Sequence, residues 1–505
     1  MGIIQKQSTV SSIIILIGFA IGGVNMLLIA PKILTAQQLG LTRVITDAGL
    51  TMATVCTFGA LPIIYKFFPI YRSYTQPKKN ELPFLTLIVC LIGFLLVSSL
   101  GYACKDLIVR KFSEKSPLFV QYSYLVYPFA FFMLMFIWLE SYSWTFKKGV
   151  ISNSLKETIP RILFTILLLL LFTKTTSFNV FIILFSLSFA LPSVLLFFIL
   201  RHTKEFYFYP HIGITTRRLK GKMANFGLFL FGAQFLNLLS KTVDTFILTA
   251  KAERGLVDTA VFTIATYIVA LLEIPQRSLN AIAIPVIAEA WRKKDKGSIQ
   301  NIYTKSVNNL LIIGILIFGI ILLNAHNLAG FLGKDYNGIE WVVFLLGIAK
   351  LVDLGTGANT QIISTSSYWK VDFTTNVIYT IMALPMNYIL ISRYGLMGAA
   401  YSNLITITFY NLMRFGFLWY KFNLQPYNLK DTVSIVAGLF AAAIAYLLPQ
   451  MPLIADVTAR TFVFLILFIP IIYFSKISME INYSINKSIT TVLRLAGIKK
   501  FDKKI

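Results

Sequence analysis

Charged side chains are scarce in this 505-residue sequence. They make up 13% of it, about half the share that is usual in soluble globular domains. The three cysteines form neither a disulfide framework nor a metal-binding spacing. The sequence also lacks a G-x-x-x-x-G-K-S/T motif, so we expect no ATP hydrolysis by this chain. These absences predict no metal site, no cofactor and no catalytic residues.

Long apolar runs dominate the chain instead. Hydrophobic residues make up 57% of it, and apolar runs of roughly 20 residues, long enough to cross a hydrocarbon core of ~30 Å, recur along nearly its whole length. The sequence therefore predicts an all-α polytopic membrane protein with about 14 transmembrane helices. The predicted spans are 10–30, 45–67, 84–103, 122–146, 157–172, 179–200, 224–248, 260–284, 307–323, 339–361, 373–391, 396–419, 432–448 and 453–474.

The charge that remains is mostly positive, with 46 basic against 21 acidic residues. Most of the basic residues fall on one side of the predicted spans, and the positive-inside rule makes that side cytoplasmic. Segment 105–115 goes against this rule. We therefore expect a multi-pass protein with both termini in the cytoplasm. The positive excess then reflects orientation and attraction to anionic lipids, not nucleic-acid binding.

The spans predict two parallel six-helix halves followed by an extra C-terminal helix pair. The predicted regions are an N-terminal half (1–200), a basic cytoplasmic linker (201–223), a C-terminal half (224–419), the helix pair (420–474) and a basic amphipathic cytoplasmic tail (475–505). Halves of six spans, an even number, run parallel, which is one of the repeat architectures of secondary transporters.

A short internal similarity supports the division into halves. "LTAQQLGL" (34–41) follows the first span and "LTAKAERGL" (248–256) follows the seventh. Each leads into a span with a proline about twenty residues past its glycine, Pro62 and Pro275.

Three pairs of opposite charges lie within predicted spans, where charge is costly and usually functional. The pairs are Lys241 with Asp244, Glu273 with Arg277, and Lys350 with Asp353. Their spacings of three or four residues place each pair on one helical face. They are either structural ion pairs facing the bundle interior or parts of a polar cavity. Lys241 and Asp244 lie in the outer third of their span, so the deeper site is predicted at the other two pairs.

Two further charges lie close to span ends. Arg414 is near a predicted inner end and Asp47 near a predicted outer end. They are either interfacial anchors, whose charged heads reach the membrane surface, or members of the same cavity.

Several stretches of the sequence resemble a known family. They are "KTVDTFILTAKAERGLVDTAVFTIATYIVALLEIPQRSLNAIAIPVIAEAWRKKD" (241–295), "LAGFLGKDYNGIEWVVFLLGIAK" (328–350) and "RYGLMGAAYSN" (393–403). Each is similar to the polysaccharide flippase branch of the multidrug/oligosaccharidyl-lipid/polysaccharide (MOP) exporter superfamily, the Wzx-like O-antigen translocases. Asp244 resembles the aspartate that this family carries in its seventh span.

The resemblance implies a flippase of the bacterial cytoplasmic (inner) membrane rather than an enzyme. Such a protein moves an undecaprenyl-diphosphate-linked glycan from the cytoplasmic to the periplasmic leaflet by alternating access, for O-antigen, capsule or exopolysaccharide biosynthesis. A glycan polymerase or glycosyltransferases are the implied partners. The cations would attract the diphosphate, and the carboxylates would couple an ion or pair with the cations. The expected anion-binding residues are Arg277, Lys350, Lys241 and Arg414, and the expected carboxylates are Glu273, Asp353, Asp244 and Asp47.

Three alternatives stay open. A lipid II flippase has a similar anionic substrate. A cation-coupled multidrug antiporter of the same superfamily would need an acidic cavity, which Lys241, Arg277 and Lys350 disfavour. A membrane glycan polymerase would need a large external loop, and no predicted loop is large enough. If the cationic cavity exists, Arg277→Ala and Lys350→Ala should abolish glycan display without lowering membrane abundance.

Overall fold

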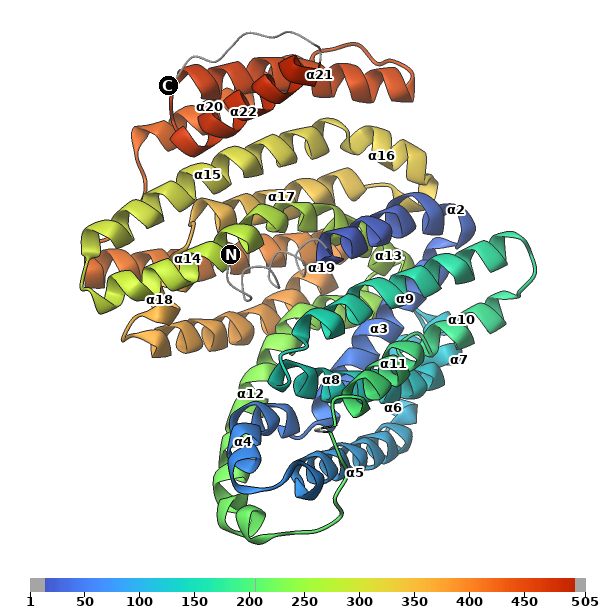
Figure 1. Cartoon of the computed structure of the whole chain (residues 1–505). Coiled ribbons are helices and arrows are strands. Elements are labelled where there is room, and N and C mark those ends of the chain that lie inside the picture. The colour runs from blue at the N-terminus through green and yellow to red at the C-terminus, as the bar shows by residue number, and fades with distance from the viewer. Residues whose placement is uncertain (1–13, 205, 496–505) are drawn as a thin grey trace. The chain divides into compact units, whose positions relative to one another are not determined.

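The computed structural model of the chain describes residues 14–204 and 206–495, and every regular element in these ranges is a helix (Figure 1). The predicted all-α class is therefore confirmed. The chain divides into two compact units. The first unit contains Met1–Ile264 and Leu384–Ala399, and the second contains Ala265–Ala383 and Ala400–Ile505. The predicted boundaries of the halves, linker, helix pair and tail stay predictions.

By length and composition, ten helices in the described ranges could cross a membrane, or up to twelve if each of two bent helix pairs is one span. Two regions of the chain account for the difference between these twelve spans and the fourteen predicted from the sequence. Helix α9 (Gly149–Phe172) carries Lys156, Glu157 and Arg161 among its apolar residues. Helix α19 (Trp369–Phe422) runs through two predicted spans, with non-helical backbone inside it at Gly395.

The first unit is organised around α3, which packs against α5, α8 and α12. Its helices are α2 (Ala30–Ile33), α3 (Ala36–Cys56), α4 (Ala60–Tyr74), α5 (Leu82–Ala103), α6 (Lys105–Phe112), α7 (Pro117–Tyr122), α8 (Val126–Thr145), α9, α10 (Phe178–Ser186), α11 (Ala190–Arg201), α12 (Ile214–Lys251), the first part of α13 (Leu256–Val269) and the middle of α19. Helix α8 supplies large buried aromatic side chains, among them Phe129, Phe136 and Trp138.

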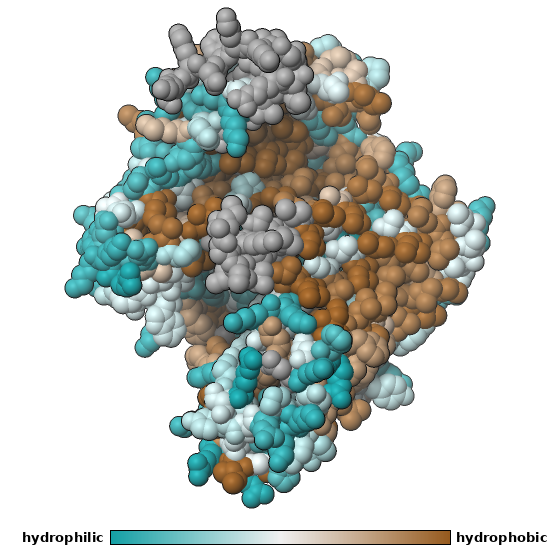
Figure 2. Space-filling view, viewed as in Figure 1, coloured by the Kyte–Doolittle hydropathy of each residue, from teal (hydrophilic) through white to brown (hydrophobic). Residues whose placement is uncertain are grey.

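The outward face of this unit is apolar. Large hydrophobic side chains lie exposed along α9, α10 and α11, including Leu169, Phe172, Leu184 and Phe198, and Figure 2 shows the hydrophobic surface spread over this region. A contiguous apolar surface of this kind indicates contact with lipid rather than with water. The chain is therefore a multi-pass membrane protein.

The second unit is organised around α15, which packs against α14, α17, α20 and α21. Its helices are the last part of α13, α14 (Glu273–Arg292), α15 (Lys296–Leu323), α16 (Ala325–Leu332), α17 (Ile339–Gly355), α18 (Asn359–Thr365), most of α19, α20 (Leu429–Tyr446), α21 (Leu453–Phe474) and α22 (Met479–Leu495). One apolar cluster joins α14, α15 and α18, and a second joins α15, α20 and α21.

Helices bend in this structure where glycine adopts a positive φ. The pairs α3–α4 and α17–α18 each bend by 47°, beside Gly59 (φ 79°) and Gly357 (φ 57°). A Cβ at Gly59 would lie 2.3 Å from the carbonyl oxygen of Gly227, so this bend also requires glycine for close backbone approach. Proline is not needed at either bend.

The two similar sequences "LTAQQLGL" and "LTAKAERGL" take up related structures. Each leads into a helix, α3 or α13, and each helix is interrupted before the helix that carries Pro62 or Pro275. The two stretches also meet, because a Cβ at Gly40 would lie 2.0 Å from the carbonyl oxygen of Leu256. The pattern agrees with a repeat, which nevertheless stays a prediction.

The basic linker is partly helical. Helix α12 begins at Ile214, ten residues before the predicted span, so the basic cluster 217–222 lies on its first turns. Arg and Lys favour helix, and the last proline before them is Pro210. In the tail, α22 covers Met479–Leu495; the last ten residues of the predicted tail, and residues 10–13 of the first predicted span, lie outside the described ranges.

Candidate functional site

Two of the predicted charge pairs lie together in the second unit. Glu273 begins α14, where the helix dipole favours a carboxylate, and Lys350 and Asp353 lie near the end of α17. Lys350 Nζ lies 3.3 Å from Glu273 Oε1 and 2.8 Å from Asp353 Oδ2. Arg277 donates to Glu273 Oε2 at 2.8 Å. Lys350 thus bridges two carboxylates that come from different helices.

The two cations of this cluster differ in exposure. The Lys350 side chain is 16% exposed, whereas the Arg277 side chain is 65% exposed. A buried ammonium between two carboxylates offsets its own desolvation cost through those partners. Arg277 keeps N–H donors directed away from Glu273, because a guanidinium has five of them. It is therefore the cation of the cluster that a ligand can reach.

Hydrogen bonds extend from Asp353 into the unit. Its Oδ2 also accepts from Gln276 at 3.2 Å, and its Oδ1 accepts from Asn411 at 3.2 Å. The Asn411 oxygen in turn accepts from Thr356 at 2.8 Å and from Asn359 at 3.1 Å. Both Asp353 oxygens thus have donors, as a carboxylate removed from water requires.

Arg414 lies at the other end of the same chain of hydrogen bonds and is almost fully buried. Its guanidinium donates to Asp372, Thr360 and Thr375, and lies 4.0 Å from the centre of the Tyr410 ring. Thr360 donates to Asn359 at 3.0 Å. This joins Arg414 to Asn411 and so to Asp353. Its burial and its three hydrogen-bonded partners agree with an interior residue rather than an anchor at the membrane surface.

We call this set the polar network. It consists of Glu273, Gln276, Arg277, Lys350, Asp353, Thr356, Asn359, Thr360, Asp372, Asn411 and Arg414. Its three cations face three carboxylates, so its formal charge is zero. An anionic ligand that binds one of these cations therefore competes with the carboxylate already paired with it.

In the first unit, Asp47 has a separate setting. Its Oδ2 lies 2.7 Å from Arg43 Nε in an ion pair. The same oxygen accepts a hydrogen bond from Thr245 Oγ1 at 2.7 Å, which ties α3 to α12. Asp244 is buried on α12, and Lys241, three residues earlier, is exposed. The predicted residues thus fall into two groups in two units, and their shared role stays a prediction.

The sequence interpretation missed the neutral members of the network and Asp372. Asn411 stands three residues before Arg414, and Gln276 one residue before Arg277. An amide inside an apolar span, next to a charge, was the available signal, because such amides rarely lie in a membrane without a partner. In the described ranges, no group of three His, Cys, Asp or Glu side chains could hold a metal ion.

Fold and network together define a class: a polytopic helical protein with a polar centre inside one of its units. No protein-family model matches the sequence, and no curated protein matches it significantly. Solved structures do match, and they include MOP superfamily transporters, whose fold this chain shares.

Three of these structures describe the likeness. An inward-facing multidrug resistance MATE family transporter of the MOP superfamily matches with a TM-score of 0.62, 16% identity, and coverage of 82% of this chain and 98% of that one. The lipid II flippase MurJ in an inward closed conformation matches with a TM-score of 0.59 and 15% identity, and the match covers 88% of this chain and 98% of that one. A MOP superfamily transporter from Pyrococcus furiosus, described as having a binding pocket of reverse polarity, matches with a TM-score of 0.55 and 14% identity. The match covers 83% of this chain and 95% of that one.

Proposed function

We propose that this protein is a flippase that moves an undecaprenyl-diphosphate-linked oligosaccharide from the cytoplasmic to the periplasmic leaflet by alternating access, in surface polysaccharide biosynthesis. The Wzx-like sequence resemblance supports this, and so does a fold shared with a lipid II flippase. One structural observation carries it: Glu273 has two cationic partners, Arg277 and Lys350.

Because Glu273 has two cationic partners, Arg277 can leave it for a ligand at a small cost in free energy. When a diphosphate binds the exposed Arg277, Glu273 keeps Lys350, so no buried carboxylate is left without a cation. A guanidinium also matches phosphate oxygens in a bidentate geometry. Arg277 is therefore the proposed contact to the diphosphate, and Lys350, Asp353 and the amides hold Glu273 and its helix in place.

A lipid II flippase is the second candidate, since the same cation would serve its anionic substrate and MurJ shares the fold. A multidrug exporter that binds cations is less well supported. Each carboxylate of the polar network already has a cationic partner, so a cationic drug would have to displace a lysine or arginine.

Transport by the purified full-length protein in liposomes tests the proposal. Three probes are compared: undecaprenyl-diphosphate-linked N-acetylglucosamine, lipid II, and the cation ethidium. Exposure of each lipid-linked sugar to a membrane-impermeant lectin reports its transbilayer movement. We expect movement of one or both lipid-linked probes and none of ethidium, and ethidium transport alone would contradict the proposal.

The matched variants are Arg277→Gln and Arg292→Gln. Both arginines lie on α14, are exposed and pair with a carboxylate on their own helix. Only Arg277 belongs to the polar network. We expect Arg277→Gln to lower the flipping rate at least tenfold and Arg292→Gln to leave it unchanged. Equal effects would exclude Arg277 as the diphosphate contact.

A further inference from the structure

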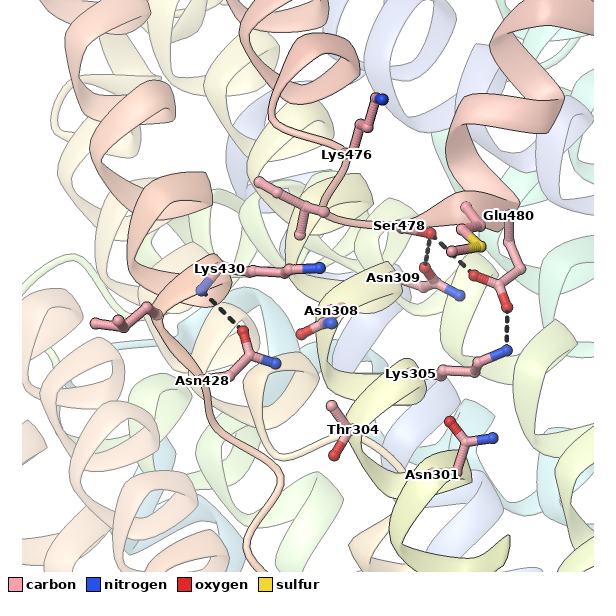
Figure 3. Close-up of a pocket in the computed structure, with 13 residues that line it drawn as sticks. Asn301, Thr304, Lys305, Asn308, Asn309, Asn428, Lys430, Lys476, Ser478 and Glu480 are labelled. Carbon is pink, nitrogen blue, oxygen red and sulfur yellow. Dashed lines mark hydrogen bonds and ion pairs between the residues drawn. The ribbon is translucent and has the colours of Figure 1, made fainter.

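A cavity of about 690 Å³ opens in the second unit, where α15, the start of α20 and the junction of α21 with α22 meet (Figure 3). It lies apart from the polar network and shares no residue with it. Its polar lining comprises Asn301, Thr304, Lys305, Asn308, Asn309, Asn428, Lys430, Lys476, Ser478 and Glu480.

The cavity lies at a membrane boundary. Helix α15 is polar up to Asn309 and apolar from Leu310 onward. Helix α20 begins its apolar stretch at Val433, and α21 ends its apolar stretch at Phe474. Three ends of apolar stretches therefore meet at this cavity, on the side predicted to be cytoplasmic. This is the depth at which lipid headgroups lie.

The cavity carries a surplus of positive charge. Lys305, Lys430 and Lys476 line it together with a single carboxylate, Glu480. Glu480 is held by Lys305 at 2.7 Å. In Figure 3 the Lys430 side chain extends toward Asn308 and Asn309, whereas the Lys305 side chain extends toward Glu480 and the Lys476 side chain points away from the other labelled residues. Two of these positive charges have no acidic counterpart among the lining residues.

Two helix N-termini add to this surplus. Asn428 is the N-cap of α20, and Ser478 accepts a hydrogen bond from the Ile481 amide in the first turn of α22. Both cap residues line the cavity. The positive ends of two helix dipoles therefore face the same space, which favours an anion.

Asn308 points to a ligand independently of these charges. It is 8% exposed and lines the cavity, and its side-chain oxygen has no hydrogen-bond partner in the described structure. Its neighbour Asn309 is different, since its oxygen accepts from Ser478 at 2.5 Å. A buried acceptor without a donor is costly. A ligand hydroxyl would supply the donor that Asn308 lacks.

We propose that this cavity binds a glycerol phosphodiester bearing free hydroxyl groups, supplied as the headgroup of an anionic lipid such as phosphatidylglycerol. Lys430 and the helix N-termini take the phosphate, and Asn308 accepts from a glycerol hydroxyl. The lipid holds the start of α22, beside Ser478, at the membrane surface. This inference does not depend on the proposed flippase activity, because its readout is lipid binding and not transport.

Native mass spectrometry of the full-length protein tests this with phosphatidylglycerol and phosphatidylcholine of identical acyl chains. Phosphatidylglycerol should bind at least tenfold more tightly, and excess inorganic phosphate or glycerol 3-phosphate should not displace it. Equal binding of the two lipids would overturn the proposal. Displacement by the soluble phosphates at micromolar concentration would assign the site to a free anion instead and so overturn the lipid source.

Variants that are expected to change the affinity for phosphatidylglycerol in opposite directions distinguish an effect on binding from an effect on folding. Glu480→Gln removes the carboxylate and frees Lys305, so phosphatidylglycerol should bind about fivefold more tightly. Lys430→Gln should weaken binding about fivefold, and Asn308→Asp, which keeps the shape but adds a negative charge, should weaken it by a similar factor. Weaker binding by Glu480→Gln would contradict the proposal, since damage to the fold can only lower affinity.

The control is Lys78→Gln with Lys79→Gln, two exposed lysines of the turn Pro77–Lys79 on the side predicted to be cytoplasmic. This pair removes more charge than Lys430→Gln does, yet leaves the cavity intact. Its affinity for phosphatidylglycerol should stay within twofold of the wild type. A loss equal to that of Lys430→Gln would show a diffuse surface effect and overturn the site.

Discussion

The polar network and the proposed lipid-binding cavity on α15, α20 and α22, called the lipid cavity below, use similar cations in opposite ways. Each has three, but the network matches them with three carboxylates, whereas the cavity has Glu480 alone. The difference follows depth. Inside the membrane an unpaired charge costs several kcal/mol, so each cation of the network has an acidic partner. At the boundary, water screens a surplus charge, which is then free to attract a ligand.

The largest effect should follow from breaking the pairing in the network. Lys350→Met removes the buried cation that pairs with both Glu273 and Asp353. This loss should destabilise the protein by about 3 kcal/mol. Thermal unfolding in detergent and abundance in membranes measure this. The pairing thus revises the expectation that Lys350→Ala leaves abundance unchanged.

A neutral variant of the same centre is the control. Combining Lys350→Met with Glu273→Gln and Asp353→Asn removes the charges together, so most of the lost stability should return. If the triple variant is no more stable than Lys350→Met, the lysine stabilises the unit by packing alone, and the contrast between network and cavity loses its basis.

A smaller loss should come from Arg414→Lys. An ammonium keeps the charge but cannot reach Asp372, Thr360 and Thr375 together, as the planar guanidinium does. We expect about 1–2 kcal/mol of lost stability, corresponding to one or two lost hydrogen bonds. Lys430→Arg in the lipid cavity is the comparison, and its unfolding temperature should not change.

Arg277→Gln should separate stability from transport. The Arg277–Glu273 pair is exposed on the arginine side, so its loss should change stability by less than about 0.5 kcal/mol, while flipping falls as described above. A large drop in unfolding temperature would instead make Arg277 a structural residue and leave the network without a proposed ligand contact.

The smallest effect concerns pH at the lipid cavity. The hydrogen bond from Lys305 lowers the pKa of Glu480 below its ordinary value of 4.5. The ion pair therefore contributes above the ordinary pKa and is lost only as the pH falls through the lowered one. Affinity for phosphatidylglycerol should stay constant from pH 7.5 to 5.5, since Glu480 stays ionised over this range and the phosphodiester does not titrate there. Tighter binding of phosphatidylglycerol at pH 5.5 would contradict the lowered pKa of Glu480.

The helix pairs of the network show what local sequence can predict. Glu273 with Arg277, and Lys350 with Asp353, were assigned to shared helical faces by spacing alone, and their atoms lie 2.8 Å apart. The contact between Lys350 and Glu273 joins α17 to α14 and has no local signal. Asp372 was overlooked because its partner Arg414 lies 42 residues away, although both belong to α19.

Composition and periodicity by themselves determined that this chain is an all-helical membrane protein and which charges share a helical face. Apolar run length and the 3.6-residue turn act within one segment, so they need no knowledge of neighbours. Tertiary structure alone decided that Lys350 holds two carboxylates, that Arg414 is buried, and that Asn308 lines a lysine-rich cavity. Those outcomes depend on which helices pack together, and the free energy of an ion pair or a buried amide depends on partners far away in the sequence.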